Sequence, residues 1–432
     1  MRVLAALPLL LLAAPALAAA PPPPGVYTNT TTVEAVAVAG DTVWVATGGG
    51  VEAYDARTLA WRRVYTTADG LAANDVRGLN VVAGAPVART DRASCTIAGD
   101  RWTCSAAPAL PAPEPRVARS FQGARETQRV ATAAGVLVGT AGRGLWLDGA
   151  APRRLTPEGQ ICSNHVTTVV EHAGAVWFGT FDEGLCRWDG TRFERAAAPF
   201  RMVNDLAATP KGLFVAASEG LFVTTDGKTF AEVAGVPEKG MNDLAYADGT
   251  LYATSPAAMW RLPLTAAAKK KARLRAFWRP GRTRAIQAVA AAGGAVWLAS
   301  EDKGALRVGK KAADAEVFDR AAGLPSSWAL DVAVAGGDAW VATLRHGLVR
   351  IDPAGRVSQV MGLPDPWLLH VSADPDGRSV WVGAQGGLAR VGQGGEVTTL
   401  HELPHPNVHV AWRKGALLVV GTEGGTQVRT IP

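Results

Sequence analysis

This sequence predicts an all-β fold, a single β-propeller of about ten (nine to ten) four-stranded blades that is closed by the N-terminal strand. Three observations support this prediction. A short apolar phrase recurs along the chain, each copy fits a unit of four strands, and the last copy lacks a fourth strand that the N-terminus can supply.

The recurring phrase ends in small residues and carries a large apolar residue near its centre. The clear copies are VWVAT (43–47), VLVGT (136–140), VWFGT (176–180), LFVAA (213–217), VWLAS (296–300), AWVAT (339–343) and VWVGA (380–384). Weaker copies lie at 86–90, 251–255 and 418–422. A period of about 40 residues with Gly at the turns is typical of propeller blades.

Residues 165–199 show the unit most clearly. HVTTVVEHAG reads as the innermost strand, AVWFGT as the second, GLCRWD as the third and RFERAA as the outermost. The second strand is apolar throughout instead of alternating, which indicates a sheet covered on both faces by neighbouring blades. We therefore expect its central Trp to pack between blades.

The chain ends on three strands, VHVAWRKG, ALLVVGT and TQVRTI, and stops at Pro432. We predict that the N-terminal strand Val26 to Thr30 completes this last blade and removes its free edge. A nine-blade ring with residues 80–116 as an irregular insertion stays open as an alternative.

The N-terminal residues predict export. Residues 1–20 combine Arg2, an apolar run and the small-residue pattern Ala16-Leu17-Ala18, which is the layout of a signal peptide. Residues 21–25 are a Pro-rich linker and 26–432 the propeller. No later apolar stretch is long enough for a membrane span, so we expect a periplasmic or extracellular protein.

The four cysteines predict two disulfides. In SCTIAGDRWTC, a turn at Gly99-Asp100 places Cys95 opposite Cys104 across a hairpin. Cys162 and Cys186 should meet on one rim of the ring. The rival interpretation is a four-Cys metal site, but the spacing lacks a CxxC-type pair.

The charge balance does not indicate nucleic-acid binding, since 44 Lys and Arg face 38 Asp and Glu. The basic residues concentrate in one outer segment that includes Lys269, Lys270, Lys271 and Arg273. This segment is either a solvated insertion or a contact for an anionic polysaccharide, lipid headgroup or acidic partner.

The repeat resembles the two-component-regulator propeller repeats, as seen in AAGLPSSWAL (321–330), ADGLAANDV (68–76) and GLVRIDPAGRVSQVMGLPDPW (347–367). That resemblance implies an exported propeller of the kind that forms the sensor part of hybrid histidine kinases and is associated with carbohydrate-derived ligands. In departure from that family, we expect no sandwich-like module, membrane span or kinase after the repeats. TTDGKTF (224–230) resembles the structural Asp-box turn of sialidase-like propellers.

No catalytic constellation emerges from the motifs. His401 to His405 matches the string HExxH, but Pro404 and Pro406 exclude the helix that zinc peptidases need, and the alternative is opportunistic metal binding by His401, His405 and His409. Carboxylate pairs such as Asp182-Glu183 lie on turns, where solvation is the ordinary role. We expect no enzyme activity, no cofactor and no metal.

The variable turns between second and third strands are the predicted binding face, because these turns and the inter-blade connectors share one rim. The predicted residues are Arg143, Asp182, Glu183, Glu301, Asp302, Lys303, Arg345, His346 and Gln385, with Trp328 and Trp367 as stacking platforms. We predict that this rim binds a partner protein or a glycan. The alternatives are a lyase or glycosidase that uses rim carboxylates, and a scaffolding envelope protein.

Overall fold

The computed structural model describes residues 21–108, 119–235, 239–264, 275–278, 285–309 and 315–432, and these residues form ten antiparallel sheets. The predicted all-β, multi-blade propeller fold is thereby confirmed. The only helical segment in these ranges is one 3-10 turn, η1 (Thr67–Asp69). In the same ranges we find no helix with the length and hydropathy that a membrane crossing requires.

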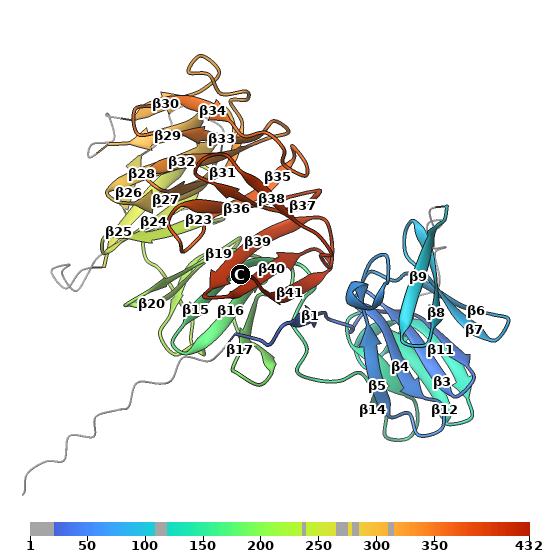
Figure 1. Ribbon diagram of the computed structural model, residues 1–432. Helices are drawn as coiled ribbons and strands as arrows, with labels where there is room; N and C mark the ends of the chain where they lie inside the picture. Colours follow the sequence, from blue (N-terminus) through green and yellow to red (C-terminus); the bar gives the residue numbers. More distant parts are fainter. Residues whose placement is uncertain (1–20, 109–118, 236–238, 265–274, 279–284, 310–314) are drawn as a thin grey trace, which may run out of the picture.

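Seven sheets form a ring (Figure 1), and we number them blades 1 to 7 in chain order. Blades 1 to 3 comprise β15 (Val166–His172), β16 (Ala175–Thr180), β17 (Leu185–Trp188), β18 (Phe193–Arg195); β19 (Val203–Thr209), β20 (Gly212–Ala217), β21 (Gly220–Thr224), β22 (Ala231–Glu232); and β23 (Asp243–Ala247), β24 (Thr250–Ser255), β25 (Ala258–Pro263), β26 (Arg275–Trp278).

Blades 4 to 6 comprise β27 (Ile286–Ala292), β28 (Ala295–Ser300), β29 (Gly304–Val308), β30 (Glu316–Phe318); β31 (Ala329–Ala335), β32 (Asp338–Thr343), β33 (Gly347–Ile351), β34 (Val357–Gln359); and β35 (Leu368–Ala373), β36 (Ser379–Ala384), β37 (Gly387–Gly392), β38 (Val397–Leu400). Blade 7 comprises β39 (Val408–Lys414), β40 (Leu417–Thr422), β41 (Gly425–Thr430) and the N-terminal β1 (Gly25–Tyr27).

Three further sheets, which we call the N-terminal module, lie beside the ring (Figure 1). Its strands are β2 (Val33–Ala39), β3 (Thr42–Thr47), β4 (Gly50–Asp55), β5 (Trp61–Tyr65); β6 (Gly78–Val82), β7 (Ala85–Arg89), β8 (Ala93–Ala98), β9 (Arg101–Ala106); and β10 (Ser120–Phe121), β11 (Ala124–Thr132), β12 (Gly135–Thr140), β13 (Gly144–Leu147), β14 (Arg153–Arg154).

Ring closure corrects one part of the sequence prediction, because the ten sheets do not form a single ring. The innermost strand of blade 7, β39, packs directly against that of blade 1, β15, so the ring closes with seven blades. The Lys414 ammonium and the Glu171 carboxylate pair across this seam at 2.6 Å. Because all blades have similar apolar faces, the repeat alone does not determine which blade packs against the last one to close the ring.

The N-terminal strand completes blade 7, as predicted. β1 pairs antiparallel with β41, with Val26 opposite Gln427. Tyr27 also packs its ring against Phe193 of blade 1, 5.4 Å between centroids. Gly425 lies so close to this strand that a Cβ there would approach the Tyr27 carbonyl oxygen to 2.7 Å, and its φ of +116° favours glycine as well.

Deleting residues 21–27 tests this closure. The deletion leaves the edge of β41 unpaired and uncovers part of blade 1, so we expect the melting temperature to fall by several degrees, about what a loss of 1 to 2 kcal/mol produces, or the protein to aggregate. Calorimetry and size-exclusion chromatography measure both outcomes. Deleting only 21–24 is the control, and equal melting temperatures for the two deletions would contradict the closure.

The module is an open arc in which the sheets are not in chain order. β2 of the first sheet contacts both β6 and β11, so the first sheet lies between the second and the third. The Gln128 side chain fixes one junction: its Oε1 accepts from the Val36 amide at 2.6 Å and its Nε2 donates to the Val36 carbonyl. At the other junction, Trp44 and Trp102 pack edge to face.

The two end faces of the arc are covered by polar side chains. On β9 the buried Trp102 alternates with exposed Arg101 and Thr103. At the other end Arg129 pairs with Glu126 and Asp148 and lies over the Phe121 ring. Terminal repeats with a polar outer face are the usual way in which an open array stays soluble.

A Trp–Arg pair recurs on adjacent strands of four ring blades. The buried Trp of the second strand lies opposite an Arg of the third strand, whose guanidinium carbon is 5.7 to 5.9 Å from the indole centroid. The pairs are Trp177 and Arg187, Trp297 and Arg307, Trp340 and Arg350, and Trp381 and Arg390. The Trp therefore packs between blades as predicted, and the Arg covers its edge.

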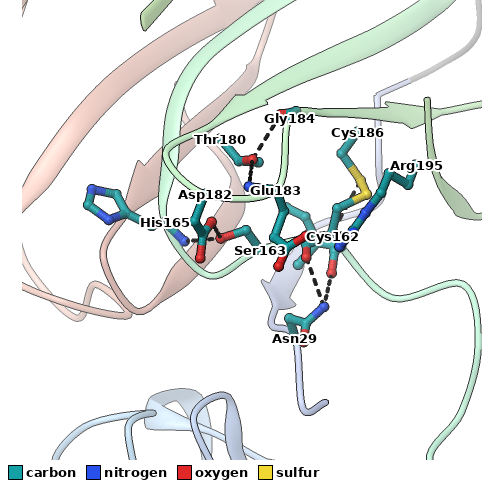
Figure 2. The surroundings of a disulfide bond; sticks show 11 residues. Asn29, Cys162, Ser163, His165, Thr180, Asp182, Glu183, Gly184, Cys186 and Arg195 are labelled. Carbon is teal, nitrogen blue, oxygen red and sulfur yellow. Dashed lines mark hydrogen bonds and ion pairs between the residues drawn. A yellow bond between two sulfur atoms is a disulfide. The ribbon is translucent and has the colours of Figure 1, made fainter. Parts of the chain in front are cut away.

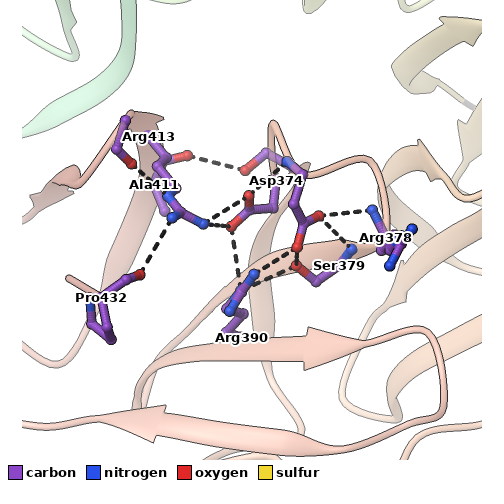
Figure 3. A network of polar contacts seen from close by, with 10 residues as sticks. Asp374, Arg378, Ser379, Arg390, Ala411, Arg413 and Pro432 are labelled. Carbon is purple, nitrogen blue, oxygen red and sulfur yellow. Dashed lines mark hydrogen bonds and ion pairs between the residues drawn. The ribbon is translucent and has the colours of Figure 1, made fainter.

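A buried carboxylate ties blade 6 to blade 7 (Figure 3). Asp374 is fully buried, and both of its carboxylate oxygens accept from Arg413 of β39 at 3.1 Å. Arg390 of β37 approaches the same carboxylate at 3.3 Å. Arg413 also donates to the carbonyl of Pro432, so this network holds the C-terminus against the ring.

Glu52 lies where the two chain segments that join module and ring cross. Its carboxyl is fully buried and accepts hydrogen bonds from the Thr30 hydroxyl at 2.7 Å and the Tyr54 hydroxyl at 2.8 Å. The Gln160 side chain bonds the same Thr30. Burial raises the pKa of Glu52 to about 7, although these hydrogen bonds oppose the shift.

Glu52→Gln should therefore change how stability depends on pH. A raised pKa means that folded Glu52 keeps a proton that unfolded Glu52 has lost, so its contribution is complete below about pH 4.5 and declines as pH rises to 7. We expect the variant to gain up to about 3 kcal/mol relative to the parent between pH 5 and 8. Urea unfolding at pH 5 and at pH 8 measures the free energy of unfolding of both proteins. Glu232→Gln, at an exposed position, is the control. Parallel pH profiles of stability for the parent and Glu52→Gln would contradict the prediction.

Two predicted segments lie outside the described residues. They are the signal peptide at 1–20 and the basic residues Lys269, Lys270, Lys271 and Arg273. Both stay predictions from sequence.

Candidate functional site

The innermost strands of the ring surround a central channel with a volume of about 690 Å³. Each contributes polar side chains near its start, where most of these strands contain a β-bulge. A bulge adds a residue and turns an extra side chain inward. The polar lining comprises Thr167, Thr168, Asn204, Asp205, Asn242, Asp243, Gln287, Asp331, His370 and His409.

Most of these polar side chains pin neighbouring blades together. Amide and hydroxyl groups donate to the first carbonyls of the next blade, as Asn204 does to Met241 at 2.7 Å and Asn242 to Ile286 at 2.6 Å. Carboxylates accept amides of the next innermost strand, as Asp243 does from Val289 at 2.6 Å. The same acceptor role recurs in Asp205 with Leu244 and in Asp331 with Val371.

The channel is acidic on one side. Burial raises the pKa of Asp205. Burial also raises the pKa of Asp243 well above its usual range, and the negative charges of Asp205 and Asp331 nearby raise it further. Repulsion between the two carboxylates disfavours the state in which both are charged. Across the channel, His370 Nδ1 lies 3.2 Å from Asp331 Oδ2.

Asp243→Asn should stabilise the ring at high pH. The Asn oxygen can still accept from the Val289 amide, while the charge that the channel disfavours is removed. Because the pKa of Asp243 is raised in the folded protein, its contribution to stability is complete at a pH below the pKa of the unfolded chain. That contribution is lost as the pH rises through the pKa of the folded protein. We expect melting temperatures close to the parent near pH 4 and above it at pH 8.

Differential scanning fluorimetry at the two pH values provides the measurement. The matched control is Asp248→Asn, an exposed turn position of the same blade. A variant that melts below the parent at pH 8 would show that the carboxylate stabilises the channel.

The turns between second and third strands lie on one rim with the connectors, as predicted. Most of these turns donate a backbone hydrogen bond to the connector of their own blade, as Leu344 does to Trp328 and Gln385 to Trp367. Some turns also donate a backbone hydrogen bond to the connector that leads into the next blade, as Gly347 does to Pro366 and Gly304 does to Ser327. At the seam, Gly425 donates to Asn164 in the same way, so blade 7 is followed by blade 1.

Blades 5 and 6 bring four of the predicted rim residues together. The guanidinium carbon of exposed Arg345 lies 4.3 Å from the ring centroid of Trp367. His346 Nδ1 approaches the Leu344 carbonyl oxygen at 2.7 Å, and Gln385 follows β36 on the next turn. Arg345 has a φ of +60°, a strained value for a side chain of this size.

Blades 4 and 5 place four further predicted rim residues, Glu301, Asp302, Lys303 and Trp328, along the same edge. Gln287 from the channel donates to the Glu301 carboxylate at 2.6 Å, so rim and channel are linked here. Asp302 is exposed, and the Lys303 amide donates to the Ser300 hydroxyl. The half-buried Trp328 has an indole nitrogen that is buried without a hydrogen-bond partner.

The disulfide of blade 1 fixes the predicted residues Asp182 and Glu183 (Figure 2). Both predicted disulfides are present, Cys95–Cys104 in the module and Cys162–Cys186 in blade 1. Next to the latter, the Ser163 hydroxyl donates to Asp182 at 2.6 Å. Glu183 pairs with Arg195 at 2.5 Å and with Arg201 at 3.6 Å.

Arg143 belongs to the module and not to the ring, and it shares a cavity with Glu183, one of the other predicted rim residues. It lines a cavity of about 590 Å³ together with Glu183, Arg195, Phe200 and Arg201 of the ring. The module therefore docks on the rim at blades 1 and 7. The Asn164 amide donates to the carbonyls of Asn29 and Gly48, and the buried Asn74 amide donates to that of Gly424.

The motifs set aside from sequence behave as expected. Residues 401–405 form an irregular connector with no helix, and Glu402 has a φ of +62°. In the turn resembling an Asp-box, Asp226 accepts from the amides of Lys228 and Thr229. A hydrogen bond from the Thr229 hydroxyl lowers the pKa of Asp226 most, and the two amide hydrogen bonds lower it further. The carboxylate therefore has a structural role in this turn.

The sequence interpretation missed the channel. Its signal was present in VND (203–205) and MND (241–243), where polar residues open strands that are otherwise apolar. In the strand that begins with VND, a β-bulge between Val203 and Asp205 turns a polar residue toward the axis, whereas MND opens a strand that pairs without a bulge.

Comparisons with known proteins identify the fold. No protein-family model matches this sequence. No curated protein matches it significantly. Among solved structures, PorZ, a surface component of the type-IX secretion system of Porphyromonas gingivalis, aligns with a TM-score of 0.55 and 15% identity, over 92% of this chain and 62% of its own.

The extracellular domain of the hybrid two component system BT3049 from B. thetaiotaomicron aligns with a TM-score of 0.52 and 14% identity, over 93% of this chain and 56% of its own. Virginiamycin B lyase from Staphylococcus aureus aligns with a TM-score of 0.51 and 13% identity, over 62% of this chain and 96% of its own. The predicted resemblance to two-component-regulator propellers is confirmed at the level of fold. This chain spans only about three fifths of the length of PorZ and BT3049.

Proposed function

We propose that this protein is an exported, non-enzymatic binding propeller that recognises a partner protein or a glycan on the rim of blades 4 to 6. The observation that carries the proposal is the group on blades 5 and 6, where exposed Arg345 lies on Trp367 beside His346. An aromatic face with several hydrogen-bonding groups around it suits a hydroxyl-rich ligand or a polar peptide loop. The two disulfides favour an oxidising, exported location.

The position of the module supports the choice of blades. It covers the rim near the seam, where Asn74 contacts Gly424 and Asn164 contacts Gly48. The turns of blades 4 to 6 keep exposed residues, including Asp302, Arg345 and His346. A large ligand has access there.

Binding is favoured over hydrolysis or elimination because the predicted rim carboxylates already have structural partners. Asp182 accepts from Ser163, Glu183 pairs with Arg195, and Glu301 accepts from Gln287. A general acid or base needs a proton-transfer position facing the substrate. The structural neighbours in the bacterial envelope, PorZ and the domain of BT3049, support an envelope partner as the class to test first.

The test replaces Arg345, His346, Asp302 and Lys303 together by Ala. We expect at least a tenfold loss of affinity, about 1.4 kcal/mol, for the ligand that the parent captures on an array of bacterial glycans or in quantitative cross-linking to envelope proteins. The melting temperature should stay close to the parent, because exposed turn residues contribute little to stability.

The matched control replaces two exposed arginines on turns of the opposite rim, Arg356 between β33 and β34 and Arg378 between β35 and β36. This variant should bind like the parent. Equal binding by the rim variant would contradict the proposal, and so would cleavage of a captured glycan, which would indicate an enzyme.

A further inference from the structure

The seam between blades 7 and 1 gathers imidazoles and a carboxylate that are far apart in sequence. The protein has seven histidines. His165 enters blade 1 from its connector, His405 lies in the connector to blade 7, and His409 is on β39. Glu423 belongs to the turn between β40 and β41.

These side chains are close enough to hold one ion. One ligand atom each of His165, His409 and Glu423 lies within 4.8 Å of the other two. His409 Nε2 is 3.1 Å from Glu423 Oε1, a separation typical of two ligands on one tetrahedral ion. His405 Nδ1 lies 3.9 Å from the other Glu423 oxygen.

Neighbouring groups hold these ligands in place. The Asn407 amide side chain donates to Glu423 Oε2 at 3.0 Å, which orients the carboxylate. The His165 ring stacks on Phe181 at 4.8 Å between centroids, and its backbone amide donates to Ser163, which donates to Asp182 (Figure 2). Support of this kind by surrounding residues is characteristic of metal sites.

The donor set selects the class of ion. Imidazole nitrogens with one carboxylate suit Zn²⁺ and similar transition metals, whereas Ca²⁺ and Mg²⁺ prefer oxygen ligands throughout. A neutral imidazole has a free nitrogen lone pair for coordination.

We infer that the seam is a binding site for a divalent transition-metal ion, Zn²⁺ being the best match, with His165, His409 and Glu423 as ligands. Such an ion would bridge two blades that are connected only through noncovalent contacts at this point. It would also lie next to the docking contact of the module, since Gly424 follows Glu423 and accepts from Asn74. The ion would therefore strengthen ring closure.

The experiment uses full-length mature protein freed of metal with a chelator that is then removed. Isothermal titration with Zn²⁺ should show one saturable site, and saturation should raise the melting temperature by at least about 2 °C. Mg²⁺ and Ca²⁺ at the same concentration should leave the melting temperature unchanged. Co²⁺ should give the visible absorption of a nitrogen- and oxygen-ligated ion at the same stoichiometry.

Three variants identify the ligands. His409→Ala, His165→Ala and Glu423→Gln should each weaken Zn²⁺ binding at least tenfold and abolish the thermal shift. The matched controls are His346→Ala and His401→Ala, exposed histidines that are not part of the cluster, which should bind Zn²⁺ like the parent.

Either of two results would overturn the inference. One is the absence of a saturable Zn²⁺ site in the parent protein, a measurement that needs no variant. The other is an unchanged Zn²⁺ affinity in the His165 and His409 variants. Because the site lies at the seam and the proposed ligand rim on blades 4 to 6, failure of one leaves the other standing.

Discussion

The structure depends on the closure of seven blades by two contacts at one seam. β1 supplies the fourth strand of blade 7, and the innermost strands β39 and β15 pack against each other. A sheet edge left unpaired or a blade face left uncovered would expose backbone groups or apolar side chains to water. Closure satisfies both requirements and forces the chain to leave the ring after β1 and to return at blade 1.

The N-terminal module follows from this path as an excursion between β1 and β15. Its three sheets cannot share the ring, so they bury their faces on one another, with the first sheet in the middle. Asn29, Asn164 and Gln160 tie the two connecting segments together where they meet. The module is thereby fixed against the rim, and it divides the rim into a covered part near the seam and an open part on blades 4 to 6.

Much of this could be predicted from the sequence because it is local. The period of about 40 residues indicates the blades, the Gly99-Asp100 turn sets the register that pairs Cys95 with Cys104, and the missing last strand points to the N-terminus. The number of blades in the ring is not local. It depends on which of ten similar apolar faces meet, and bonds such as Asn164 to Gly48, between residues more than a hundred positions apart, decide it.

The same distinction explains the candidate sites. The rim could be predicted, since the alternation of strand directions puts all second-to-third turns on one side. The sequence placed Arg143 on the rim of the ring itself, whereas its turn belongs to the module and lines a cavity with Glu183 and Arg201 of the ring. The channel residues were overlooked because the β-bulge beside Asp205 leaves little trace in the sequence beyond a polar residue at the start of the strand, and Asp243 opens a strand that pairs without a bulge.

The histidine cluster depends on the ring size itself. In a ring of ten blades the last blade would meet the sheet that begins at Val33, and three blades would separate His165 from His409. With seven blades the connector of blade 1 comes next to blade 7, and the two imidazole centroids are 4.7 Å apart. Side chains from residues 165, 409 and 423 are thus brought together by the contact that closes the ring, and an ion held by them would act on that contact directly.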